Sequence, residues 1–140
     1  MYETVRTETD ARGVATLWLA RSEKHNAMSA QMLADLVAAA KALDADDRVR
    51  VVVLAAEGKS FCAGGDLAWM RAQFEMDAAT RKRESAKLST MLQALDTLAK
   101  PLIGRVQGNA FGGGMGLMSV CDVVIAEEGR NSALPRPGWG

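Results

Sequence analysis

The strongest constraint on the fold is a unit that occurs twice in the chain: an apolar run, a loop with adjacent glycines, and an apolar segment of helical character. The first copy reads VVVLAAEGKSFCAGGDLAWM over residues 51–70, and the second reads LIGRVQGNAFGGGMGLMSV over residues 102–120. Apart from the glycines the two copies share no sequence, so the repeat is one of architecture. Strands that alternate with helices predict an α/β fold whose strands pair in parallel.

The segments around this unit complete the predicted domain. Two strand-like runs, residues 2–8 and 14–20, flank a turn with Asp10 and Gly13 and predict a β-hairpin. The continuous β-branched run over 49–56 predicts a strand buried on both faces. The remaining predicted elements are a helix capped by Ser29, helices over 67–74 and about 77–98, a strand over 102–108, a helix that begins at Gly116, and a strand over 122–128.

Composition excludes several classes of partner. The 140 residues carry 17 Lys and Arg against 17 Asp and Glu, and only 5% are aromatic, so nothing indicates a nucleic acid partner. We find no apolar run of about 18 residues and predict no membrane span. The polar N-terminus is unlike a signal peptide, and Cys62 and Cys121 are isolated, which predicts buried, reduced thiols in the cytoplasm and no metal site.

Two glycine-rich loops at helix starts suggest a chemical role. Glycines let a ligand approach the free N–H groups of a helix N-terminus, and two such loops can hold one developing oxyanion. A phosphate-binding P-loop fits less well, because Met115, Gly116 and Leu117 stand where Lys and Ser or Thr are needed. A dinucleotide-binding pattern is met only loosely. Tight packing of helix against strand explains the glycines equally well from spacing alone.

Five segments, KHNAM, FCAGGDL, KPLIGRVQG, AFGGGMGL and CDVVIA, occur in an order that resembles the N-terminal half of the crotonase superfamily, the enoyl-CoA hydratase/isomerase family. The resemblance covers residues 1–128. It implies a crotonase-like spiral of β-β-α units, here truncated, in which a parallel sheet is flanked by helices. It also implies an acyl-CoA thioester as substrate, with coenzyme A as part of that substrate and no separate cofactor.

The resemblance assigns roles to particular residues. The catalytic groups it implies are the backbone N–H groups of Gly65 and Gly113, which would polarise the thioester carbonyl and stabilise an enolate. The residues it implies for binding the substrate are Lys24, Asn26, Ala27, Ala63, Gly64, Asp66, Leu67, Gly112 and Gly116. Structural roles remain open for several of them: Lys24 as a solvated charge, Asn26 as a turn residue, and Asp66 as a helix cap.

Water addition across the double bond also needs acid–base groups, and the resemblance does not supply them. In related hydratases a glutamate stands at the position of Gly116, and a second one falls near Arg136, where the segment GRNSALPRPGWG contains no carboxylate. Gly116 favours a methylglutaconyl-CoA hydratase or a related enzyme of branched acyl groups. An isomerase of the same family and a CoA-binding fragment without catalysis remain alternatives.

The tail, residues 129–140, departs from the family pattern. We hypothesise a frameshift near Gly129, because one set of codons for the tail, read one base out of frame, gives a family-like continuation. On that hypothesis the chain lacks the C-terminal helices that build the family's homotrimer or dimer of trimers. We therefore expect weak or absent turnover and a last strand open to aggregation.

Overall fold

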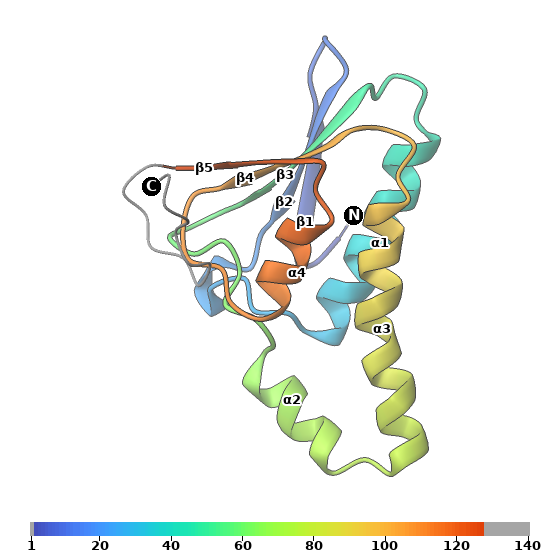
Figure 1. The fold of residues 1–140 in the computed structure, drawn as a ribbon, viewed down its shortest axis with the longest axis vertical. Coiled ribbons are helices and arrows are strands. Elements are labelled where there is room, and N and C mark those ends of the chain that lie inside the picture. The colour runs from blue at the N-terminus through green and yellow to red at the C-terminus, as the bar shows by residue number, and fades with distance from the viewer. Residues whose placement is uncertain (1, 128–140) are drawn as a thin grey trace.

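The computed structural model describes residues 2–127 and contains one mixed sheet with helices (Figure 1). The N-terminal hairpin, the helices and the alternation of strand and helix are present as predicted. In chain order the elements are β1 Val5–Thr9, β2 Val14–Leu19, the 3-10 turn η1 Ser22–Lys24, α1 Ala30–Ala45, β3 Val51–Ala56, α2 Leu67–Phe74, α3 Ala78–Asp96, β4 Leu102–Val106, α4 Gly113–Ser119 and β5 Val123–Ala126. The hypothesised out-of-frame tail, residues 129–140, lies outside the described residues.

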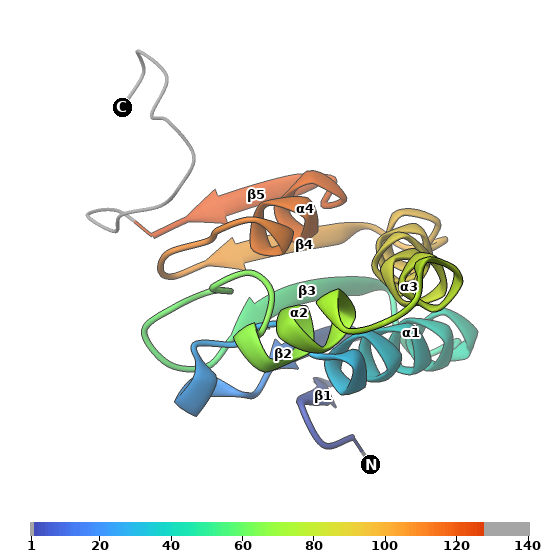
Figure 2. The same cartoon turned by 90° about the horizontal axis from the view of Figure 1, so that it is seen from below.

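The five strands lie in the order β1-β2-β3-β4-β5. The hairpin pair β1–β2 is antiparallel, and each of the following pairs is parallel. Figure 2 shows α1, α3 and α4 on one face of this sheet. The predicted α/β class with mainly parallel pairing is therefore confirmed, in a two-layer form.

The helices on one face correct the expectation that β3 is buried on both faces. Val52 and Leu54 are buried in the core, whereas Val51 and Val53 on the other face are half-buried and only Ala55 of that face is buried. The β2 strand alternates in the same way between buried and half-buried residues. A continuous β-branched run indicates a preference for strand, but it does not indicate which faces of that strand are covered by helices.

Side-chain caps fix the start of three helices. The Ser29 Oγ accepts a hydrogen bond from the Met32 N–H at 3.2 Å, and Asp66 does the same for the Trp69 N–H at 3.0 Å. Asp77 accepts from the Thr80 N–H at 2.7 Å. Each carboxylate or hydroxyl satisfies an N–H that the helix itself leaves without a partner. The capping roles that the sequence suggested for Ser29 and Asp66 are confirmed.

The helix α4 begins earlier than the sequence indicated. We expected the glycine run to form a loop before a helix at Gly116, but three of its glycines lie inside α4, which starts at Gly113. Gly112 precedes the helix with a φ of +50°, in the region that favours glycine. Gly114 has no room for a side chain, since an added Cβ would lie 2.7 Å from the Cys62 carbonyl oxygen. Close packing against Cys62 thus explains the glycine at position 114.

Helix α2 and the first turns of α3 project from the sheet as an arm (Figure 1). None of the α2 residues is buried, and Phe74 at its end is 79% exposed. In α3 the buried residues, Met91 and Leu95, come from the half nearer to β4. Among residues 2–127, no helix combines the length and the apolar character needed to cross a membrane.

Candidate active site: two glycine loops and a groove

Three loops meet at the edge of the sheet where the parallel strands end. They follow β2, β3 and β4, and this edge is where open α/β sheets usually bind their ligands. Backbone hydrogen bonds join the loops to one another: Ala63 N–H donates to the His25 carbonyl at 3.0 Å, and Phe111 N–H donates to the Cys62 carbonyl at 3.0 Å. The two glycine segments are thus held side by side, as the sequence suggested.

The two N–H groups predicted to bind a carbonyl oxygen belong to Gly65 and Gly113. Within the described part of the chain, neither N–H donates a hydrogen bond. The surrounding backbones are in close contact, because a Cβ added to Gly64 would lie 3.2 Å from the Phe111 carbonyl oxygen and one added to Gly112 would lie 3.9 Å from the Gly64 Cα. Two free donors on adjoining loops could donate to one oxygen placed between them.

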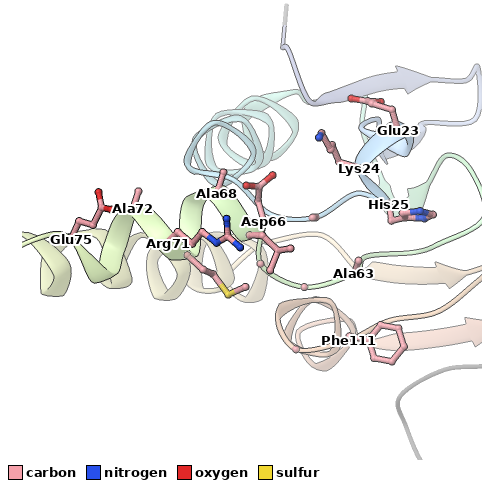
Figure 3. A pocket seen from close by; sticks show the side chains of 16 residues that line it. Glu23, Lys24, His25, Ala63, Asp66, Ala68, Arg71, Ala72, Glu75 and Phe111 are labelled. Carbon is pink, nitrogen blue, oxygen red and sulfur yellow. The ribbon is translucent and has the colours of Figure 1, made fainter.

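An open groove of about 1070 Å³ runs along these loops. Figure 3 shows its two walls: Glu23, Lys24 and His25 lie on one side, and α2 lies on the other. Phe111 lies at the end formed by the loop before α4. The lining residues are Glu23, Lys24, His25, Ala27, Ala63, Gly64, Gly65, Asp66, Leu67, Ala68, Met70, Arg71, Ala72, Glu75, Phe111 and Gly112.

Most residues of the predicted site line this groove. The structure brings together Lys24, Ala27, Ala63, Gly64, Gly65, Asp66, Leu67 and Gly112. Gly113 begins α4 directly after Gly112 but is not itself among the lining residues. Gly116 lies one turn further along α4, where an added Cβ would meet the Leu92 side chain of α3 at 3.5 Å. The prediction that Gly116 lines the substrate site is therefore not supported, since Gly116 is absent from the groove lining and lies next to α3.

Asn26 is fully buried, and its side chain is engaged by the protein. Its Oδ1 accepts from the Arg21 N–H at 2.8 Å, and its Nδ2 donates to the carbonyls of Glu57 and Ser60 at 2.9 and 3.0 Å. With a φ of +56° it closes the turn after η1. These contacts support the turn-forming role of Asn26, which joins the first loop to the second.

Asp66 combines its capping role with an ion pair. Its Oδ2 lies 2.9 Å from a guanidinium nitrogen of Arg21, and Arg21 also donates to the Ala27 carbonyl at 2.8 Å. The hydrogen bond from the Trp69 N–H, followed by the contacts with Arg21, lowers the pKa of Asp66 from its ordinary value of 3.8. Asp66 is therefore a carboxylate that fixes the groove wall, and it is poorly suited to take up a proton near neutral pH.

The groove also contains residues that the sequence analysis did not single out. Arg71 and Met70 of α2 and Phe111 of the third loop line it. Arg71 forms no ion pair within residues 2–127, and Lys24 forms none there either. The spacing from the Asp66 cap places Arg71 on the second turn of α2. This spacing in the sequence could have identified Arg71 as a residue of the groove.

The described residues contain no group of three His, Cys, Asp or Glu side chains arranged to hold a metal ion. Cys62 is fully buried, and burial raises the pKa of its thiol. Cys121 is only half-buried, against expectation, and burial also raises its pKa, to about 11. Both thiols are therefore protonated near neutral pH and weak as nucleophiles.

Comparison with known proteins gives a consistent result. The sequence profile described as enoyl-CoA hydratase/isomerase matches residues 9–140. An enoyl-CoA hydratase from Alternaria alternata is 34% identical over 126 residues, which cover 90% of this chain and 42% of that protein. A 4-chlorobenzoyl coenzyme A dehalogenase from an Arthrobacter species is 34% identical, with 88% of this chain and 45% of that protein covered.

Solved structures agree in fold. The enoyl-CoA hydratase of Mycobacterium smegmatis superposes with a TM-score of 0.87 at 39% identity, covering 94% of this chain and 51% of that one. The enoyl-CoA hydratase of Shewanella pealeana gives a TM-score of 0.86 at 35% identity, over 89% of this chain and 46% of that one. The chain thus spans about half the length of the relatives it matches. On sequence profile, relatives and fold together, it belongs to the enoyl-CoA hydratase/isomerase family.

Proposed function

We propose that this chain binds an acyl-CoA thioester in the groove, with the thioester carbonyl oxygen between the N–H groups of Gly65 and Gly113. One observation carries the proposal: these two N–H groups lie on adjoining loops and donate to nothing within the described residues. Buried or partly buried backbone N–H groups normally have a partner, so two free N–H groups, one in the groove lining and one directly after the lining residue Gly112, mark a place for an acceptor.

The groove walls suit the remainder of such a ligand. Lys24 and Arg71 provide positive charge, and both are free of ion pairs in residues 2–127, which suits the phosphates of coenzyme A. Leu67, Met70 and Phe111 provide apolar surface for the acyl and pantetheine chains. The names of the relatives, enoyl-CoA hydratases and a coenzyme A dehalogenase, favour the same class of ligand.

The reaction proposed for the whole protein is hydration of an enoyl-CoA through an enolate stabilised by this pair of donors. The described residues contribute three carboxylates to the groove, Glu23, Asp66 and Glu75, and Asp66 is occupied by Trp69 and Arg21. Gly116 has no side chain and faces Leu92. This chain therefore polarises the carbonyl more readily than it activates water, which favours binding without appreciable turnover. An isomerase would use the same two donors.

A comparison of two substitutions at Gly113 tests the role of its N–H. Gly113→Pro removes the donor at the first position of α4, where proline is tolerated, and Gly113→Ala adds a Cβ but keeps the donor. Calorimetry would give the dissociation constants of acetyl-CoA and of free CoA for each variant. We expect the proline variant to lose about threefold to tenfold of the preference for acetyl-CoA relative to the alanine variant, the range of one hydrogen bond.

Equal preferences in the two variants and in the unaltered protein would contradict the proposed carbonyl site. Turnover is tested separately, with crotonyl-CoA and methylglutaconyl-CoA followed by loss of enoyl absorbance. Hydration at about 10 per second, an ordinary turnover number, would overturn the proposal of binding without appreciable turnover. A shift of the double bond without water addition would assign isomerisation instead.

A further inference from the structure

Met28 contacts both of the loops that carry the two free N–H groups. It lies in the loop after β2, directly before the Ser29 cap of α1, and only 1% of its surface is exposed. Neither the motifs nor the comparisons with known proteins assign it a role. Its backbone faces the Gly65 loop, and its side chain faces Gly113.

The Met28 backbone fixes the direction of the Gly65 N–H. Met28 N–H donates to the Gly64 carbonyl at 2.6 Å, and the Asp66 N–H donates to the Met28 carbonyl at 2.7 Å. Met28 and Gly65 thus form a parallel β-bridge. In a parallel bridge the residue between the two bonded neighbours directs its own N–H and carbonyl away from the partner. The Gly65 N–H therefore points away from Met28 and stays free for another acceptor.

The Met28 side chain sets the position of the second donor. A Cβ added to Gly113 would lie 2.9 Å from the Met28 Sδ and 3.0 Å from its Cε, so the thioether packs directly against the Gly113 Cα. The first residue of α4 thereby rests on a side chain whose own backbone holds the Gly65 loop. Met28 therefore contacts both loops, one through its backbone and the other through its thioether.

We propose that Met28 is a positioning residue that sets the separation of the Gly65 and Gly113 N–H groups. The inference rests on the proposed function, since it needs both groups to bind one carbonyl oxygen. A shared oxygen must lie about 2.7–3.1 Å from each donor, so an oversized or collapsed gap weakens at least one hydrogen bond. Truncation at Met28 should therefore weaken polarisation of the thioester without loss of the CoA contacts.

The test uses para-dimethylaminocinnamoyl-CoA, whose absorption moves to longer wavelength when hydrogen bonds polarise its carbonyl. Met28→Ala should reduce this red shift and weaken binding of the probe about threefold to tenfold, the range of one hydrogen bond, with the affinity for free CoA unchanged. Met28→Leu should give an intermediate shift, because it fills more of the gap. Met91→Ala, at a methionine of α3 with 0% exposure, is the matched control and should keep the full shift in its folded fraction.

A reciprocal pair separates positioning from general loss of packing. Gly113→Ala should reduce the red shift, because the new Cβ collides with the Met28 thioether. The double variant, Gly113→Ala with Met28→Ala, should regain part of the shift, because the added methyl group then occupies vacated space. Additive losses in the double variant would contradict the positioning role.

The outcomes also separate this inference from the proposed function. A full red shift in Met28→Ala, together with a red shift in the unaltered protein, overturns the role of Met28 alone. No red shift in the unaltered protein, despite binding of the probe, overturns the carbonyl site and with it this inference. Should Met28→Ala fail to fold, Met28→Leu and the Gly113→Ala variant decide the question, with folding followed by circular dichroism.

Discussion

Replacement of Asn26 should destabilise the whole fold, although the residue lies next to the groove. Asn26→Ala removes three hydrogen bonds, to Arg21, Glu57 and Ser60. At about 1 kcal/mol each, they contribute about 3 kcal/mol. Alanine at a φ of +56° adds a penalty of about 1 kcal/mol. The expected loss is about 4 kcal/mol, compared with about 5–15 kcal/mol for a typical domain.

Two further variants divide this loss between its causes. Asn26→Gly removes the same three hydrogen bonds but adopts the left-handed conformation freely, so it should cost about 1 kcal/mol less than Asn26→Ala. His25→Ala changes the preceding left-handed residue, which is exposed and has one side-chain hydrogen bond, at 3.1 Å to the Ser60 Oγ. It should cost no more than about 1–2 kcal/mol.

Urea unfolding followed by circular dichroism measures all three free energies of unfolding. A loss below about 1 kcal/mol in Asn26→Ala would refute the reasoning, since it would mean that the three bonds are replaced by water without penalty. If Asn26→Ala lost affinity for CoA while its free energy of unfolding stayed unchanged, the result would instead support the substrate-binding role that the family resemblance implied for Asn26.

Two other properties of the fold lead to predictions of their own. The pKa of Asp66 is lowered in the folded state, so its stabilising effect is present above pH 3.8 and is lost as the pH falls below that value. On acidification, the free energy of unfolding should therefore fall less in Asp66→Asn than in the unaltered protein. Urea titrations at a series of pH values would measure this difference. An equal fall in both proteins would mean that the acid sensitivity arises elsewhere. The strand β5 exposes Val123, Val124 and Ile125, so Ile125→Lys should reduce concentration-dependent light scattering, whereas Gln93→Lys, on the exposed side of α3, should not. Equal scattering by both variants would place the association on another surface.

The sequence predicted those features that depend on neighbours along the chain. The hairpin follows from alternation around Asp10 and Gly13, and Ser29 and Asp66 act as caps because a short polar side chain before an apolar helix accepts from the first turn. The meeting of the two glycine loops follows from the parallel pairing of β3 and β4, whose ends share one edge.

Other features depend on contacts between distant segments and left no local pattern. The start of α4 at Gly113 requires the close approach of Cys62 to Gly114, across more than fifty residues of chain. The inward orientation of Asn26 depends on the carbonyls of Glu57 and Ser60, and the half-buried face of β3 depends on helices that all lie on one side. Periodicity and capping signals report local preference, so tertiary contacts of this kind escape them.

The hydrogen bonds between the three loops have a consequence for motion at the site. The His25 carbonyl accepts a hydrogen bond from the second loop, and Met28 bonds to the residues on either side of Gly65. The Cys62 carbonyl accepts a hydrogen bond from the third loop, so the three loops form a short ladder of backbone hydrogen bonds. A ladder of this kind opens as one cooperative unit, and its amide protons should exchange with solvent at similar free energies of opening. An acyl-CoA held by any two of the loops would then slow exchange in the third, including at residues it does not touch.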